Sequence, residues 1–352
     1  MSSTLFFLLS GEHETLPAAE VRAILECENF DHKEFRSTPK LATVKSEPRC
    51  ISTVVKRSGM CEAAGLLIFE CLGVEDEILR NASDVSYSDY LKEGERFSVR
   101  VQRIFGSSRH LDRMELQSRI GNMILRSAPG SRVDLRRPQK EFIGIIDNGR
   151  FLFGYLTARR MNSSLNRHRS MEDFTLHPST MKPRLARCLV NLSRPRRGEI
   201  LLDPFCGVGG LLVEAVTVGC RVVGYDLDPR MVSKTIRNLR KVGVEPEGVL
   251  VADARAIPCS TIRSISTDPP YGRGASTMGS NPYELVREFL AETLSVLSPK
   301  GFLCLASPLD VGVQILGQDA GLIVVESHVM RVHRGLVREI VVFTRDSSVR
   351  KG

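Results

Sequence analysis

The chain has 352 residues, of which 42% are hydrophobic and 26% are charged, and its net charge is +8. This length predicts two or three domains, and the composition is typical of a soluble globular protein and excludes a wholly disordered chain. Trp is absent and aromatic residues make up 6% of the chain, which argues against a broad aromatic platform for stacking bases.

The apolar runs and the cysteines indicate the cellular compartment in which the protein is found. No run approaches the ~20 apolar residues that a membrane-spanning helix needs, so we expect no membrane association. The run at residues 5–9 is too short for a signal-peptide core and lacks a basic flank, so we interpret it as a buried strand. We expect a cytoplasmic protein whose nine cysteines are reduced. No two cysteines form a CxxC pair, and we predict no metal site.

The N-terminal part, residues 1–85, predicts a small domain that mixes a helix with short strands. Residues 18–25 have the spacing of an amphipathic helix. Residues 51–55 and 66–69 are rich in β-branched and apolar side chains, and we interpret both as strands.

A second domain is predicted for residues 86–160. Residues 97–101 alternate as a strand with its apolar face at odd positions, and residues 114–125 have helical spacing. Further strands are expected at residues 133–135, 142–146 and 151–156. Asp147-Asn148-Gly149, between the last two, is a hairpin signal. The domain is predicted to be α+β.

Positive charge is concentrated in the middle of the chain. Residues 96–200 contain 22 Lys and Arg against 8 Asp and Glu, a balance of +14, whereas the rest sums to −6. The planar guanidinium of Arg suits phosphate, so we predict a polyanion-binding surface rather than an ordinary solvated face. Residues 161–175 are expected to be a polar, basic linker. The candidate polyanion-binding residues are Arg100, Arg103, Arg132, Arg136, Arg137, Arg167 and Arg169.

Residues 176–352 predict an α/β domain, because from Pro183 onward helical and strand patterns alternate, which is typical of βαβ units and a parallel sheet. Residues 199–210 form an apolar strand that leads into a glycine-rich turn. The next strand ends at Asp226, 19 residues after Gly207. This is the spacing at which a carboxylate meets ribose hydroxyls in a nucleotide-binding unit. A third strand ends at Asp253.

The acid before the glycines, Asp203, indicates which nucleotide binds. It would repel a pyrophosphate but suits a cationic ligand without phosphate, and S-adenosylmethionine is such a ligand. Each acid alone could be a helix cap or a turn residue, but three at successive strand ends favour a methyl-donor site. The candidate cofactor-binding residues in this region are Asp203, Phe205, Gly207, Gly209, Asp226, Leu227, Asp253 and Ala254.

A candidate catalytic motif, Asp268-Pro269-Pro270-Tyr271-Gly272, follows the fourth predicted strand. The two prolines fix the backbone, so that the carbonyls and the Asp268 carboxylate become fixed hydrogen-bond acceptors. Two acceptors on an exocyclic amine would hold it in line with the sulfonium methyl and take up developing positive charge. Tyr271 can stack on the base. The amine could be N6 of adenine, N4 of cytosine or N2 of guanine.

These residues resemble the THUMP-containing tRNA guanine-N2 methyltransferases of archaea and eukaryotes that act on guanosine 10. Four segments carry the resemblance: residues 173–192, which resemble an upstream helix that covers the donor, and residues 203–210, 268–272 and 331–340. It implies a class I (Rossmann-like) S-adenosylmethionine-dependent methyltransferase domain preceded by an α+β ferredoxin-like domain and a THUMP RNA-binding domain. It adds His177 and Pro178 as donor contacts and makes tRNA the partner of the arginines.

The family resemblance leaves alternatives on the substrate. A sister group that modifies guanosine 6 more often begins its catalytic motif with Asn, so Asp268 and the C-terminal segment favour position 10. A DNA amino-methyltransferase and a catalytically silent RNA-binding module are the other possibilities. The resemblance implies transfer of one methyl group, and in archaeal members a second. It also implies a small zinc-binding activator protein as a partner of the methyltransferase domain.

Overall fold

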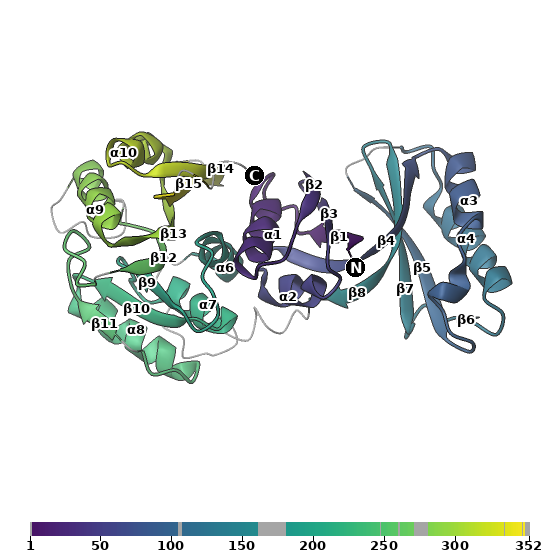
Figure 1. The fold of residues 1–352 in the computed structure, drawn as a ribbon, viewed down its shortest axis with the longest axis horizontal. Helices are drawn as coiled ribbons and strands as arrows, with labels where there is room; N and C mark the ends of the chain where they lie inside the picture. The colour runs from purple at the N-terminus through teal and green to yellow at the C-terminus, as the bar shows by residue number, and fades with distance from the viewer. Residues whose placement is uncertain are drawn as a thin grey trace. The chain divides into compact units, whose positions relative to one another are not determined.

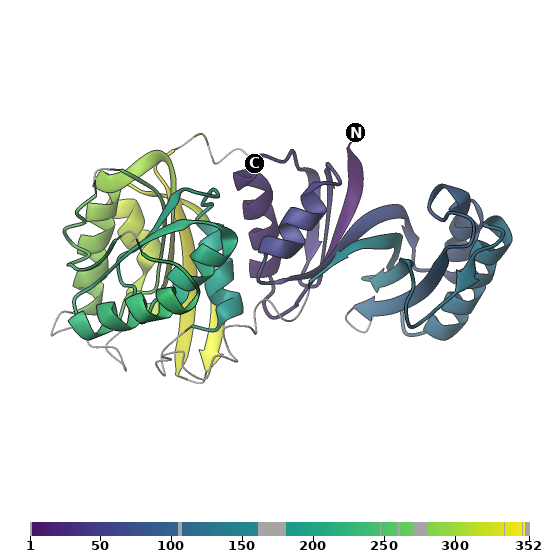
Figure 2. The ribbon, with the colours of Figure 1, turned by 90° about the horizontal axis from the view of Figure 1, so that it is seen from below.

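The computed structural model describes residues 2–104, 108–160, 181–246, 248–259, 261–270, 281–333, 335–346 and 348. The chain divides into two compact units, shown in Figures 1 and 2. The first unit consists of Met1–Ser10, Asp31–Lys56 and Cys61–Arg160, and the second of Gly11–Phe30, Arg57–Met60 and Met161–Gly352. Among the described residues, no helix is long and apolar enough to cross a membrane.

The first unit contains one eight-stranded sheet, with the strand order β2-β3-β1-β4-β8-β7-β5-β6. Its strands are β1 (Ser3–Leu9), β2 (Lys33–Thr38), β3 (Leu41–Ser46), β4 (Cys61–Leu72), β5 (Arg96–Ile104), β6 (Arg132–Val133), β7 (Lys140–Asp147) and β8 (Arg150–Arg159). Its helices are α2 (Cys50–Arg57), α3 (Glu75–Ser83), the short η1 (Tyr87–Asp89) and α4 (Arg113–Ser127). β5 pairs in parallel with β6 and β7, and the other pairs are antiparallel.

The predicted alternation of β5 is confirmed. Phe97, Val99 and Val101 are buried in one core with Ile120 and Ile124 of α4. In Figure 1, α3 and α4 lie together on one side of the strands of this region. The apolar face of the helix and the odd positions of the strand therefore form this core.

The hairpin between β7 and β8 is also confirmed. Asp147 pairs with Arg150, and the two residues between them, Asn148 and Gly149, have φ angles of 47° and 75°. Positive φ at both central positions is typical of the tightest hairpin turn, which Asn and Gly adopt most readily.

One predicted strand is wrong, and another is shorter than expected. Residues 51–55 lie in α2, in which Cys50, Ile51, Val54 and Val55 are buried. This spacing is that of one helix face, so burial outweighs the strand preference of the β-branched side chains. The strand expected at residues 133–135 ends at Val133.

The second unit contains a seven-stranded sheet, with the order β11-β10-β9-β12-β13-β15-β14. Its strands are β9 (Ile200–Asp203), β10 (Arg221–Asp226), β11 (Gly248–Val251), β12 (Ile262–Thr267), β13 (Leu297–Pro308), β14 (Ile323–His333) and β15 (Leu336–Thr344). Its helices are α1 (Leu16–Cys27), α6 (Pro183–Leu192), α7 (Gly210–Val218), α8 (Pro229–Lys241), α9 (Pro282–Val296), η2 (Leu309–Val311) and α10 (Val313–Asp319).

The prediction of a parallel sheet holds for β9 to β13 and is wrong for the last two strands. β15 runs antiparallel to both β13 and β14. The reason is the short connection: β14 ends at His333 and β15 begins at Leu336. Parallel neighbours need a long crossover, so two strands joined this closely form a hairpin.

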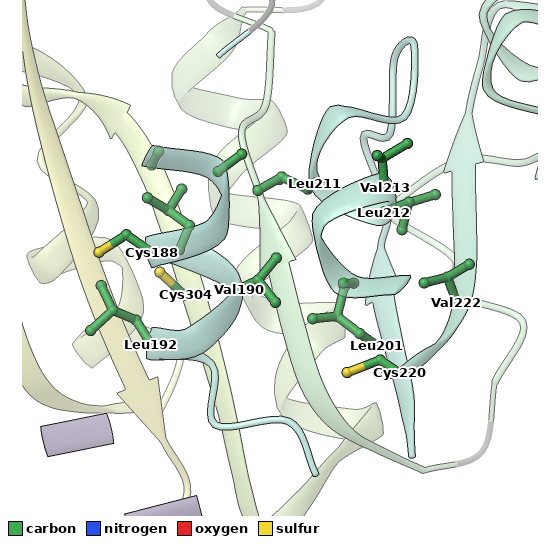
Figure 3. Close-up of a cluster of buried hydrophobic side chains, with 14 of the residues drawn as sticks. Cys188, Val190, Leu192, Leu201, Leu211, Leu212, Val213, Cys220, Val222 and Cys304 are labelled. Atoms are coloured by element: carbon green, nitrogen blue, oxygen red, sulfur yellow. The ribbon is translucent and has the colours of Figure 1, made fainter. Parts of the chain in front are cut away.

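Two hydrophobic cores cover the two faces of this sheet, because neighbouring residues of a strand point to opposite faces. Leu201 and Cys304 belong to one core, to which α6 and α7 contribute. Figure 3 shows this cluster, with side chains from both helices facing those of the strands. Leu202 and Leu303 belong to the other core, which α9 and α10 cover. Burial on both faces leaves the strand ends as the place for polar chemistry.

Candidate active site

Three acids lie at the carboxyl ends of neighbouring strands in the second unit. Asp203 ends β9, Asp226 ends β10, and Asp268 follows directly after β12. β9 lies between β10 and β12 in the sheet, and all three strands are parallel. The three side chains therefore meet at one edge, where open α/β sheets bind their ligands.

Asp203 is the most deeply buried of the three, with 1% of its surface exposed. Its Oδ1 accepts a hydrogen bond from the Thr267 hydroxyl at 2.7 Å and one from the backbone N–H of Phe205 at 3.2 Å. Burial raises the pKa of this carboxyl to about 7, and the charges of Asp268 and Asp226 add to the rise. An ionised Asp203 is therefore stabilised by a cation brought into the site.

The glycine-rich turn is tied to the next strand by Asp226. Its Oδ2 accepts from the N–H of Gly207 at 2.9 Å, and its Oδ1 accepts from the N–H of Asp228 at 2.9 Å. The Thr235 hydroxyl donates to the carbonyl of Gly207 at 2.7 Å. Gly209 has a φ of 85°, and a Cβ there would lie 2.9 Å from Thr235 Cγ2. The turn thus requires glycine at this position.

The residues at this edge fit the expected methyl donor. The turn carries acids on both sides, and the charges of Asp268 and Asp226, which add to the raised pKa of the buried Asp203, favour a ligand with positive charge. An ammonium and a sulfonium satisfy this requirement, whereas a pyrophosphate does not. At Gly207, which also has a positive φ of 53°, a Cβ would meet no atom of the described residues within 4 Å. This leaves open space beside the turn.

Four other candidate donor contacts have environments of their own. Asp253 forms an ion pair with Arg255 at 2.6 Å, and this interaction lowers the pKa of the Asp253 carboxyl. Leu227 is 39% exposed. Ala254 is buried in the core, and the ring of Phe205 packs edge-on against Phe289. Ala254 and Phe205 therefore offer mainly backbone groups.

Asp268 and the prolines leave the end of β12 as the sequence predicts. Pro269 is buried and Pro270 half-buried. Burial raises the pKa of Asp268 to about 6, and the guanidinium of Arg338, 3.3 Å from its Oδ2, acts in the opposite direction. Oδ1 of Asp268 is buried and accepts no hydrogen bond from any residue that the structure describes. An acceptor atom at the site is therefore left for a ligand.

Several predicted site residues lie outside the described part of the chain. They are His177, Pro178, Tyr271, Arg167 and Arg169. The roles assigned to them stay predictions.

The remaining candidate arginines belong to the first unit, on β5, β6 and the segment after β6. Arg132, Arg136 and Arg137 are exposed. Arg100 is 58% exposed and lies 3.4 Å from Glu141. The guanidinium of Arg103 donates to the carbonyls of Ser108 and Leu111 at 3.1 and 2.8 Å, so it also holds a loop. Four of these arginines thus present charge to solvent, and the fifth is largely engaged within the protein.

Three residues of the site were missed from the sequence. Thr267 and Thr235 hold Asp203 and the glycine turn through their hydroxyls, and Arg338 pairs with Asp268. Thr267 directly precedes the catalytic motif, and Arg338 lies inside the C-terminal segment that carries the family resemblance. Their places in these two segments were the signals from which they could have been identified. The contacts themselves could not be predicted, because they join segments far apart in the chain.

Comparisons with known proteins agree with this geometry. The family model described as RMKL-like, methyltransferase domain matches residues 170–340, and the THUMP domain model matches residues 74–153. The crystal structure of TrmN from Thermus thermophilus covers 97% of this chain and 99% of its own, with a TM-score of 0.54 and 20% identity. The two family models, together with the shared fold, confirm the predicted class I methyltransferase domain preceded by a THUMP region.

Two curated relatives extend over nearly the whole chain. The tRNA (guanine(10)-N2)-dimethyltransferase of Methanothermobacter thermautotrophicus is 36% identical and covers 96% of this chain and 98% of its own length. The protein of the same name from Methanocaldococcus jannaschii is 28% identical and covers 96% and 99%. The predicted resemblance is therefore confirmed, and the chain belongs to the family of the tRNA (guanine(10)-N2)-dimethyltransferases.

Proposed function

We propose that this protein is an enzyme that methylates the exocyclic N2 amine of guanosine 10 in tRNA, with S-adenosylmethionine as the methyl donor. One observation carries the proposal: Asp268-Pro269-Pro270 leaves β12 next to β9, whose end carries the buried Asp203 and the glycine-rich turn. The near-complete overlap with a tRNA (guanine(10)-N2)-dimethyltransferase of 36% identity supports the choice of base and position.

The acceptor amine needs help because its lone pair is delocalised into the guanine ring. In the proposed reaction, Oδ1 of Asp268 and the carbonyl of Pro269 accept its two N–H groups. These acceptors orient the nitrogen and stabilise the positive charge that develops as the new N–C bond would form and the methyl–sulfur bond of the donor would break. The methylated amine would then lose one of its N–H protons to solvent. Proline fixes the backbone on which both acceptors stand. Tyr271 would stack on the base, which must leave any helical stack to reach the site.

The donor, when bound, supplies a methyl group on a sulfonium. We assign its methionine part to Asp203 and Gly207, its ribose to Asp226, and its adenine amine to Asp253. The remaining proposed contacts are Phe205, Gly209, Leu227, Ala254, His177 and Pro178. The raised pKa of Asp203 supports the first assignment, since a carboxylate that is buried and has other acids beside it is stabilised by a bound cation.

The THUMP domain, which we place at residues 86–160, is proposed to hold the tRNA through its arginines. Arg100, Arg132, Arg136 and Arg137 are the main contacts in this proposal, with Arg103, Arg167 and Arg169 beside them. Exposed guanidinium groups near the end strand of a sheet suit the phosphates of an RNA helix.

Two further features of the proposal concern the setting of the reaction. We place the enzyme in the cytoplasm, which its nine free cysteines support. From the family resemblance, a small zinc-binding activator protein pairs with the methyltransferase domain. Activity of the purified chain alone, equal to that with such a protein added, would remove the activator from the account.

The proposal is tested with the purified protein, labelled donor and an unmodified tRNA transcript. We expect nucleoside mass spectrometry to detect N2-methylguanosine and N2,N2-dimethylguanosine, and fragment mapping to place both at position 10. A transcript with adenosine at position 10 is the matched control and should take no label. Label at position 6, or preferential methylation of duplex DNA, would contradict the proposal.

A further inference from the structure

The C-terminal segment that carries part of the family resemblance has a residue that reaches the catalytic motif. β15 presents neighbouring side chains to opposite faces. Glu339 accepts a hydrogen bond from the Ser327 hydroxyl at 2.8 Å and another from the side chain of Gln314. Arg338, the preceding residue, turns the other way and lies 3.3 Å from Oδ2 of Asp268. Glu339 therefore has a structural role on one face of β15, and Arg338 on the other face contacts the site.

Strand order explains how Arg338 reaches Asp268. β13 lies between β12 and β15, and Arg338 pairs with Pro308, the last residue of β13. Thr267, the last residue of β12, pairs with Leu305 of the same strand. Asp268 and Arg338 therefore both lie near the carboxyl end of β13. Because β13 ends there, it does not stand between their side chains.

The pair is nearly dry, with 10% of the Arg338 side chain and 18% of the Asp268 side chain exposed. A buried ion pair contributes little net stability, since both groups lose their hydration. Among the described residues, the charged groups that act on or respond to Asp268 are Arg338 from β15 and Asp203 from β9, whose pKa Asp268 raises. Arg338 therefore supplies a positive charge in a site that is otherwise acidic.

We propose that Arg338 is a positioning residue: its ion pair with Oδ2 fixes the Asp268 carboxylate, so that Oδ1 remains to accept the guanine amine. The inference rests on the proposed methyl transfer to N2. It uses both observations on the carboxylate, since one oxygen faces the guanidinium and the other is buried without a hydrogen bond from the described residues. A flat guanidinium restrains a carboxylate in direction as well as in charge.

Loss of Arg338 has a second consequence, because Asp268 must be ionised to accept both contacts. Burial alone favours the protonated form, which turns an acceptor oxygen into a donor. Without the guanidinium, the pKa of Asp268 rises above its present value of about 6. The active, ionised form is then reached at higher pH than in the unmodified protein.

The test measures single-turnover methyl transfer to tRNA from about pH 5 to about pH 9 for Arg338→Gln, Arg338→Lys and a control, Arg287→Gln. Arg287 is an exposed arginine of α9 that pairs with Glu284. We expect Arg338→Gln to slow transfer about tenfold or more at pH 7. It should also move the acid limb of the pH–rate profile, where the rate falls as pH is lowered, upward by about one pH unit or more. Arg338→Lys should keep the limb near its original place, and Arg287→Gln should behave as the unmodified protein.

A direct readout needs neither donor nor tRNA. In protein labelled with ¹³C at the aspartate carboxyls, the resonance lost in Asp268→Ala identifies Asp268, and its titration should move to higher pH in Arg338→Gln. An unchanged titration and an unchanged acid limb would overturn the inference. So would an Arg338→Lys variant whose acid limb moves upward by about one pH unit or more relative to the unmodified protein, a comparison that stands even if Arg338→Gln fails to fold. Failure of the unmodified protein to methylate guanosine N2 would refute the proposed function instead.

Discussion

The acids of the second unit and the arginines of the first are both clusters of like charge, but they differ in their exposure to solvent. At the strand ends Asp203 is buried and Asp268 is half-buried, and loss of hydration raises their pKa values to about 7 and about 6. Arg136 and Arg137 are exposed. A buried charge acts through its position, whereas an exposed one adds to a shared field. The two regions should therefore respond very differently to single substitutions.

The largest effect is expected at Asp268. Replacement by Ala removes the acceptor of the amine, and turnover should fall by about 10²–10³-fold while tRNA affinity stays unchanged. Single-turnover rates and filter binding of tRNA measure the two quantities separately. An equal loss of binding and turnover would contradict the role of Asp268, because it would place this residue in tRNA recognition.

The next effect is on stability and concerns the glycine turn. Gly209→Ala should lower the free energy of unfolding by about 2–3 kcal/mol, since Ala strains the positive φ and its Cβ meets Thr235. Gly243→Ala is the matched control: its φ is 80°, but in the part of the chain that the structure describes a Cβ there meets no atom within 4 Å. The control should lose about 1 kcal/mol in the same urea titration. Equal losses would show that the close approach to Thr235 costs nothing.

Asp203→Asn should weaken donor binding but stabilise the free protein. The folded pKa of about 7 lies above the ordinary 3.8. Folding therefore takes up a proton between these values, and stability falls as pH rises from about 4 to about 7. The neutral amide avoids this loss, which is at most about 4 kcal/mol, and keeps an acceptor for Thr267.

Calorimetry at about pH 8 checks both halves of this expectation, with donor affinity reduced about tenfold or more and a higher Tm. A donor affinity equal to that of the unmodified protein would remove Asp203 from the cation site. An unchanged Tm would show that the ionised carboxylate carries no penalty in the folded state.

The smallest effect is expected at the arginines. The double variant Arg136→Gln/Arg137→Gln should weaken tRNA binding several-fold and reduce the slope of its salt dependence by about one unit per lost phosphate contact. Arg119→Gln/Arg150→Gln removes the same charge from ion pairs with Glu75 and Glu70 and serves as the control. If both double variants change the slope equally, net charge alone explains the binding.

The sequence was most informative where one segment carries the whole signal. The glycine turn, Asp203 and Asp226 at their strand ends and the Asn148-Gly149 hairpin follow from local spacing and lie where predicted, whereas Asp253 lies two residues beyond the end of β11. Residues 51–55 were misread because their β-branched side chains suit a strand, whereas only the packed structure shows that one helix face is buried.

Contacts between distant segments could not be predicted. The Thr267 hydroxyl reaches Asp203 across 64 residues of sequence. Arg338 reaches Asp268 only because β15 returns antiparallel to β13, and that strand direction was itself predicted wrongly. The ion pair that Arg255 forms with Asp253, the residue assigned to the adenine amine, was not foreseen either. Charge pairing of this kind depends on side-chain geometry that spacing does not encode.

The central claim is that the exocyclic amine of guanine is the methyl acceptor held by Asp268. Two tRNA transcripts that differ only in guanosine or inosine at position 10 test it most directly, since inosine lacks that amine. We predict equal binding of the two transcripts and methyl transfer to the guanosine transcript alone. Transfer to the inosine transcript at a comparable rate would contradict the account.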